Sequence, residues 1–162
     1  MTTSYQKKIM SWSEAEKQRD LLASSGRKIV FTNGCFDLLH PGHLRYLAQA
    51  RSLGDFLTVG LNSDRSISAL KGPSRPVCPE EVRAEMLAGL SSVDAVVVFD
   101  QDTPLELITV LKPDVLVKGG DWPVDHIVGS RFVLERGGEV HSLLLADGFS
   151  TTALIARIRE LG

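Results

Sequence analysis

The chain has 162 residues, of which 43% are hydrophobic and 23% are charged. This length and composition are typical of one globular domain whose core is large enough to fold without disulfides or a structural metal. The 18 basic and 20 acidic side chains give a formal charge of −2, which argues against nucleic-acid binding through a broad positive face. An anionic ligand must therefore meet a local cluster of basic groups.

The sequence gives no sign of export or of a membrane span. Its N-terminal segment lacks the apolar core of a signal peptide, and no apolar run approaches the roughly 20 residues that a membrane helix needs. The two cysteines, Cys35 and Cys78, form no C-x-x-C motif and no zinc-like spacing with histidine. We therefore expect a cytoplasmic protein with no membrane partner.

Short apolar runs alternate with helical patterns along the chain. The runs are nearly continuous in their hydrophobicity and predict buried strands at 28–33, 56–61, 95–99, 114–117 and 140–145. Helical patterns occupy 42–52, 79–90, 104–111, 127–136 and 151–161, with a weaker turn after Asn62. This alternation predicts an α/β fold, a doubly wound five-stranded parallel sheet with helices on both faces.

The N-terminus is expected to form a helix outside the repeating pattern. Ser13 followed by Glu16 reads as a capping box that opens this helix. No repeat, linker or shift in composition marks a second domain. We therefore predict a single domain over residues 1–162, with a helical extension at 1–26 and a catalytic core at 28–162.

The loop after the first predicted strand carries the strongest functional signal. Gly34 and Gly42 allow the backbone to approach a ligand, and the free N–H groups of the helix that follows suit a phosphate. His40 and His43 lie at the same helix start, so both imidazoles can face one anion. The alternatives are two incidental histidines in a solvated loop, or a metal pair for which no third ligand is evident.

Two further loops carry basic side chains. Segment 70–77 is rich in glycine and proline and presents Lys71 and Arg75, with Arg83 on the next predicted helix. These charges suit a second phosphate, although ordinary solvent-facing charges give the same pattern.

The loop after the fourth predicted strand, segment 117–122, reads as anion-facing because it combines Lys118 with two glycines. Asp121 and Trp122 beside it are suited to hold sugar hydroxyls and a sugar face, and Trp122 alternatively packs in the core.

A third cluster opens the last predicted helix. Asp147 and Gly148 lead into Phe149 and three successive hydroxyl residues, Ser150 to Thr152. One of these hydroxyls is expected to cap the helix, and three exceed what a cap needs.

The motifs together resemble a known group of enzymes. The chain has neither a P-loop nor a G-x-G-x-x-G motif after a strand. Segment 32–43 is instead similar to the H-x-G-H signature of the cytidylyltransferase-like nucleotidyltransferases, which have a Rossmann-like fold. In order, FTNGCFDLLHPGH, LNSD, LKGPSRPV, VKGGDW and DGFSTT resemble the adenylyltransferases that make ADP-heptose from D-glycero-β-D-manno-heptose 1-phosphate and ATP. The resemblance covers about Lys28 to the C-terminus. Many such enzymes are the C-terminal half of a bifunctional protein with a sugar kinase, and this length resembles the stand-alone form.

The resemblance also implies roles for individual residues. His40 and His43 would hold the nucleotide phosphates and stabilise charge in the transition state, with Lys118 as a third catalytic residue. Asp37 would help to place a magnesium ion. The implied nucleotide site comprises Thr32, Asn33, Gly34, Cys35, Phe36, Gly42, His43, Gly119, Ser150, Thr151 and Thr152. The implied site for the substrate phosphate comprises Lys71, Arg75, Arg83, Asp121 and Trp122.

The expected reaction is transfer of AMP from ATP to the heptose 1-phosphate, with magnesium, to supply ADP-heptose for lipopolysaccharide or another surface glycan. The resemblance further implies a homodimer. One alternative is a cytidylyltransferase acting on glycerol 3-phosphate or another small phosphate, and another is a nucleotide-sensing module without chemistry. The sequence indicates no functional role for the remaining histidines, His126 and His141.

Overall fold

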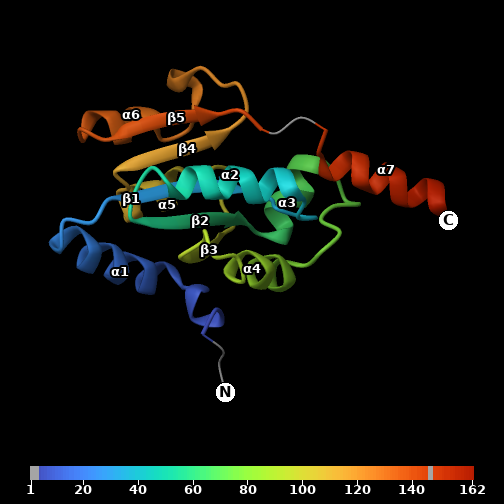
Figure 1. Cartoon of the computed structure of the whole chain (residues 1–162), viewed down its shortest axis with the longest axis horizontal. Coiled ribbons are helices and arrows are strands. Elements are labelled where there is room, and N and C mark those ends of the chain that lie inside the picture. The colour runs from blue at the N-terminus through green and yellow to red at the C-terminus, as the bar shows by residue number, and fades with distance from the viewer. Residues whose placement is uncertain (1–3, 146–147) are drawn as a thin grey trace.

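The computed structural model in Figure 1 describes residues 4–145 and 148–162. The parallel sheet at its centre consists of β1 (Ile29–Gly34), β2 (Phe56–Asn62), β3 (Ala95–Phe99), β4 (Val115–Gly119) and β5 (Glu139–Leu143). Within the described residues the sheet has five strands in the order β3-β2-β1-β4-β5, and every neighbouring pair is parallel. The predicted fold class is confirmed.

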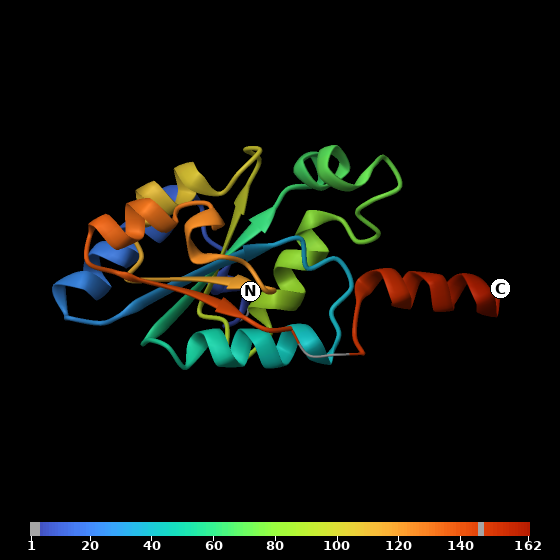
Figure 2. The same cartoon turned by 90° about the horizontal axis from the view of Figure 1, so that it is seen from above.

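Helices cover both faces of the sheet. Two of them, α2 (Pro41–Arg51) and α4 (Glu80–Ala88), contribute to the apolar core on one face. The core on the other face includes residues of α1 (Trp12–Ser24), α5 (Leu105–Leu111) and α6 (Ser130–Glu135). Figure 2 shows α2 on one side of the strands and α5 and α6 on the other. The strands are therefore buried on both faces, which explains their continuous hydrophobicity.

The direction of winding changes between β1 and β4. From β1 the chain passes through α2 to β2 and onward to β3, and after β3 it returns through α5 to β4 on the opposite side of β1. β1 and β4 pair in register, with Thr32 opposite Val117. Ligands of such sheets bind beyond the carboxyl ends of the strands that flank this change of direction.

The start of α1 differs from the prediction. Its capping box is formed by Ser11 and Glu14 and not by Ser13 and Glu16, so the helix begins two residues earlier. Both pairs satisfy the sequence pattern, but only the earlier start lets Trp12 pack against the core and donate its indole N–H to Val98 O at 2.9 Å. Tertiary contacts thus choose between two overlapping caps.

Two other elements also depart from expectation. The weak turn after Asn62 is a full helix, α3 (Asp64–Lys71), which Ser63 caps by accepting from Ser66 N. The region predicted as one helix at 127–136 contains the shorter helix α6, and the 3-10 helix η2 (Val124–His126) lies just before the region. A second 3-10 helix, η1 (Gln6–Lys8), precedes α1.

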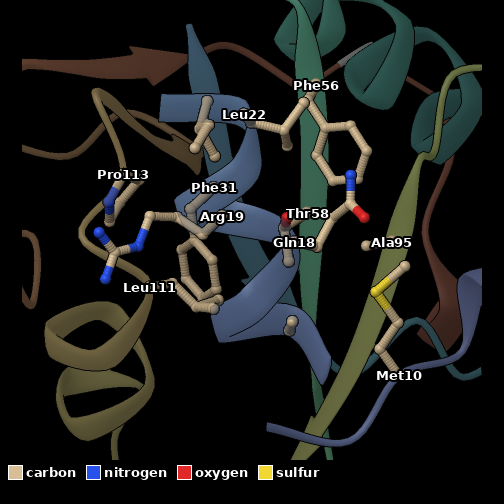
Figure 3. A pocket seen from close by; sticks show the side chains of 12 residues that line it. Met10, Gln18, Arg19, Leu22, Phe31, Phe56, Thr58, Ala95, Leu111 and Pro113 are labelled. Carbon is tan, nitrogen blue, oxygen red and sulfur yellow. The ribbon is translucent and has the colours of Figure 1, made fainter. Parts of the chain in front are cut away.

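A small hollow lies in the seam between α1 and the sheet (Figure 3). Leu22, Phe31 and Phe56 are among the side chains that line it, and Arg19 lies at its edge. Its volume is about 10 Å³, which is close to the space that a single water molecule occupies. The hollow is a packing gap and not a ligand site.

The last helix, α7 (Thr151–Leu161), extends away from the rest of the domain (Figures 1 and 2). None of its residues is buried, and Leu154, Ile158 and Leu161 are exposed. No helix within the described residues is long and apolar enough to cross a membrane.

Candidate active site

A cavity of about 160 Å³ lies at the carboxyl ends of β1 and β4, where the winding changes direction. We call it the first cavity. Residues from four separate predicted motifs line it, which places these motifs around one site. The predicted residues among its lining are Asn33, Gly34, Cys35, Phe36, Asp37, His43, Lys71, Arg75, Lys118, Gly119 and Thr151.

The two histidines of the H-x-G-H motif form a stacked pair at the start of α2. His40 is the N-cap residue, and its ring centroid lies 3.8 Å from that of His43 at an interplanar angle of 22°. A Cβ at Gly42 would come within 2.9 Å of the His40 ring, so glycine leaves room for this stacking. The Nδ1 atoms of both histidines are buried and have no hydrogen-bond partner among the described residues. Unpaired buried polar atoms are costly, so folding stability alone does not favour this arrangement of the two rings.

Both imidazoles are biased toward the neutral form. Burial lowers the pKa of His40, and burial together with the nearby His40 and Lys71 lowers the pKa of His43 to about 4. The two rings are therefore neutral at pH 7 in the absence of ligand. An anion beside them would raise both pKa values, because it stabilises the protonated form.

The loop before α2 is held in a compact shape. Phe36 has a φ of 45°, in the left-handed region, and its ring packs edge-on against His43 with centroids 5.4 Å apart. A Cβ at Gly34 would lie 2.9 Å from the Phe36 ring. Gly34 leaves space for the Phe36 ring, and the Phe36 ring in turn fixes the position of the His43 ring.

Asp37 anchors the loop of residues 72–78 between α3 and α4, which carries Arg75 and is called the basic loop below. Its carboxylate accepts from Arg75 Nε at 2.7 Å and from the backbone N–H groups of Val77 and Cys78, and its side chain is 1% exposed. Burial by itself would raise the pKa of Asp37, but these hydrogen bonds and the Arg75 guanidinium lower it, so the group stays ionised. This network holds Arg75 at the cavity with its Nη2 atom buried and unpartnered among the described residues.

The predicted magnesium role of Asp37 finds no support in this arrangement. Both carboxylate oxygens are already hydrogen-bonded, and the described residues contain no group of three or more His, Cys, Asp or Glu side chains arranged to hold a metal ion. Magnesium prefers oxygen ligands and often takes several from substrate phosphates and water. The described protein groups at the first cavity therefore do not form a metal-ligand set of their own.

Two lysines supply unpaired positive charge. Lys71, at the end of α3, and Lys118, at the end of β4, both line the cavity. Neither forms a hydrogen bond or ion pair with another described residue. Burial lowers the pKa of Lys118. An ammonium partly withdrawn from water and lacking a counter-charge favours binding of an anion.

Arg83 has a structural position, which corrects the expectation that it binds the substrate phosphate. Its side chain is 0% exposed and donates to the backbone oxygens of Cys78, Cys35 and Asn62 and to Asp64 Oδ1, at 2.7 to 2.9 Å. These bonds tie the β1–α2 loop to β2 and to the basic loop. The guanidinium thus supports the cavity from behind and does not reach into it.

Thr32 is likewise buried behind the site. It is 0% exposed, and its Oγ1 lies 2.5 Å from the hydroxyl of Tyr46, which lines the first cavity. Burial raises the pKa of Tyr46 to about 12, although Thr32 and the Gly119 backbone oppose this shift. Sequence reasoning missed Tyr46; the available signal was its position three residues after His43, on the same face of α2.

The hydroxyl residues Ser150 to Thr152 have different positions at the start of α7. Ser150 caps α7 by accepting from Ala153 N at 2.9 Å, and Thr151 donates to Leu38 O at 3.2 Å and lines the first cavity. Thr152 is exposed. Phe149 stacks near His40 with centroids 6.0 Å apart, which joins the start of α7 to the start of α2. Asp147 lies outside the described residues.

Asp121 and Trp122 lie beyond the end of β4, and both are exposed. Neither lines the first cavity; Trp122 lines a neighbouring one.

Comparison with known proteins agrees with this geometry. The sequence pattern of the family described as "Cytidylyltransferase-like" matches residues 31–157, most of the chain. The chain belongs to the cytidylyltransferase-like family. Its membership confirms the expected class of enzyme, a nucleotidyltransferase, and the matched residues include every motif that lines the first cavity.

Curated relatives include larger proteins. The "Bifunctional protein HldE" of Syntrophotalea carbinolica is 58% identical over 148 residues, which cover 90% of this chain and 30% of that protein. The protein of the same name from Caulobacter vibrioides is 56% identical over 153 residues, covering 94% of this chain and 32% of the relative. The chain thus spans about a third of the length of these relatives.

Solved structures share the fold. The lipopolysaccharide core biosynthesis protein from Thermoplasma volcanium superimposes with a TM-score of 0.59 and 25% identity, covering 75% of this chain and 98% of that one. The pantoate-beta-alanine ligase from Francisella tularensis has a TM-score of 0.55 at 15% identity, covering 84% of this chain and 66% of the ligase. The ligase shows the fold alone.

Proposed function

We propose that this chain transfers AMP from ATP to D-glycero-β-D-manno-heptose 1-phosphate, releasing pyrophosphate and ADP-heptose. The proposal rests chiefly on one observation: His43, on which His40 is stacked, lines the same cavity as Lys71, Arg75 and Lys118. The choice of heptose rests on the motif resemblance described above and is supported by the similarity to HldE.

In the proposed reaction a phosphate oxygen of the sugar 1-phosphate attacks the α-phosphorus of ATP. A new P–O bond forms, the bond between the α-phosphorus and the bridging oxygen breaks, and that oxygen leaves with pyrophosphate. Because the nucleophile is already an anion, no general base is required. The protein contributes positioning and charge stabilisation, which dominate catalysis of this class of transfer.

Each group then has a distinct task. The imidazoles and the N–H groups at the start of α2 would bind the triphosphate. Lys71 and Arg75 would neutralise charge on the departing pyrophosphate or the acceptor phosphate, and Lys118 would lie at the reacting phosphorus. Magnesium would enter with the nucleotide and supply further charge neutralisation. We also propose a cytoplasmic protein that supplies a surface glycan such as lipopolysaccharide, and a homodimer.

The test is pyrophosphate release by the purified protein with magnesium. ATP, CTP, GTP and UTP are each combined with the β-heptose 1-phosphate, its α-anomer and glycerol 3-phosphate. Release confined to ATP with the β-heptose phosphate is the expected result. Preference for CTP with glycerol phosphate would overturn the proposal in favour of a cytidylyltransferase, and ATP binding without any turnover would favour a nucleotide sensor.

A further inference from the structure

A second cavity of about 240 Å³ lies next to the first. The two cavities share Asn33 and Lys118, at the ends of β1 and β4. The rest of its lining comes from the loop after β4 and from Pro104 before α5. The first cavity borders the core under α2, through Phe36 and Tyr46, whereas the second borders the core under α5 and α6, through Ile127.

Trp122 forms an exposed but firmly held wall of the second cavity. Its ring is held because the indole N–H donates to Gly119 O at 3.1 Å and its backbone N–H donates to Ser142 Oγ at 2.9 Å. Ser142 in turn donates to Gly120 O. The residue nevertheless remains 51% exposed. An aromatic ring fixed in place while exposed provides a preorganised apolar surface for a ligand.

Gly120 allows the Trp122 ring to lie in this position. Its φ is +116°, and a Cβ there would lie 2.7 Å from the indole nitrogen of Trp122. The V-K-G-G-D-W segment therefore turns tightly enough to lay the ring beside the end of β4.

The rest of the wall is suited to a sugar. Ile127, Val128 and Pro104 give apolar surface, and Asn33 and His126 add hydrogen-bonding groups. A mainly apolar cavity with a few polar groups is typical of small-molecule sites. The His126 side chain is 69% exposed, and among the described residues its ring makes only a 4.0 Å contact with Asp125, so the ring is available to hydroxyls.

We infer that the second cavity is the acceptor subsite, and that it binds the sugar ring of a sugar 1-phosphate between Trp122 and His126. This inference rests on the proposed function. The sugar packs its C–H face on the Trp122 ring, and its phosphate lies at Lys118, the group common to both cavities. The nucleotide occupies the first cavity, so the acceptor oxygen approaches the α-phosphorus from the opposite side of the β1–β4 boundary.

The test compares Trp122→Ala, Trp122→Phe and His126→Ala with the control Val124→Ala. Val124 is an exposed residue of η2 that does not line the cavity. We expect Trp122→Ala and His126→Ala to raise the KM for the sugar 1-phosphate by about tenfold or more, as loss of a stacked or hydrogen-bonded contact implies. Trp122→Phe should keep the KM for the sugar 1-phosphate close to the wild-type value, because it retains an aromatic ring. The Kd for ATP should change less than about twofold in every variant.

Two results would contradict the inference and leave the proposed function intact. One is an unchanged acceptor KM in both alanine variants of an active protein; the other is loss of ATP affinity, which would assign the cavity to the nucleotide. If the wild type turns over none of the acceptors, the proposed function fails. The subsite is then judged by fluorescence of the wild type and of Trp122→Phe during titration with the β-heptose 1-phosphate. Quenching seen only in the wild type supports the subsite, and equal traces refute it.

Discussion

Asp37→Asn separates an anchoring role of this carboxylate from a metal-binding one. The substitution keeps the size of the side chain but removes the charge that pairs with Arg75 and replaces one acceptor oxygen by a donor group. The Asp37 side chain is 1% exposed and that of Arg75 is 13% exposed, so water replaces little of the lost interaction. Removing one partner from a buried pair costs about 3–5 kcal/mol. Because the asparagine oxygen retains part of the hydrogen bonding, we expect the free energy of unfolding to fall by about 3 kcal/mol.

The assay is urea unfolding followed by circular dichroism at pH 7, without nucleotide or metal. Asp102→Asn is the matched control, since Asp102 is exposed and makes no hydrogen bond or ion pair with a described residue; it should change the free energy of unfolding by less than about 0.5 kcal/mol. If Asp37→Asn behaves like this control and instead raises the magnesium concentration needed for activity, the anchoring argument is wrong.

The pH dependence gives a second check. The folded-state pKa of Asp37 lies below its usual value of 3.8, so its ionised form stabilises the folded protein. That contribution is fully present above the unfolded pKa and disappears as the pH falls through the folded pKa. The difference in stability between wild type and Asp37→Asn should therefore be constant near neutral pH and shrink below pH 3.8. A difference that grows in acid would contradict the assigned charge state.

Three further predictions follow from the geometry. His43→Asn should lower kcat by about 100-fold. Calorimetry at pH 6 in buffers of different ionisation enthalpy should show less proton uptake on ATP binding for the variant than for the wild type, because the pKa of free His43 is about 4. Near-native turnover, or equal heats, would refute its role. Gly42→Ala should displace the His40 ring and lower kcat by at least about tenfold. Stability should not fall, because alanine favours a helix over glycine by about 1 kcal/mol. The assays are kcat and thermal unfolding, and full activity of the variant would contradict a catalytic role for the stacked pair. Arg83→Met should lower the free energy of unfolding in urea by about 3–5 kcal/mol and leave the acceptor KM of the folded protein unchanged. A raised acceptor KM with unchanged stability would show instead that Arg83 binds the substrate.

Local patterns predicted most of the fold. Strands buried on both faces are apolar throughout, and Gly and Pro mark where they end, so the predicted strands differ from the observed ones by one or two residues at most of their ends. Where two patterns overlapped, as in the caps at Ser11 and Ser13, only the packing of Trp12 decided between them. The apolar run at 140–145 predicts a strand that reaches Leu145, but β5 ends at Leu143, and Leu144 and Leu145 are exposed.

The site was predictable to the extent that its chemistry is carried by consecutive residues. The motif around His40 and His43 needs no long-range information, because a loop and a helix start create it. The roles of Asp37 and Arg83 depend on partners far away in sequence, and a charged residue alone does not indicate whether its partner is a ligand or the protein itself. Burial of these two groups could be found only in the folded chain.

The distribution of unpaired polar atoms argues that the first cavity is built for an anion. The described residues contain five buried side-chain atoms that lack a hydrogen-bond partner, and three of them belong to His40, His43 and Arg75. His43 and Arg75 line the first cavity, and His40 is stacked on His43. Meanwhile Asp37, the acidic residue lining the cavity, is fully engaged by Arg75 and backbone N–H groups. The protein thus satisfies the negative charge of Asp37 internally, while Lys71 and Lys118 at the same cavity have no acidic partner among the described residues. This imbalance of charge favours an anionic ligand, as the proposed function requires.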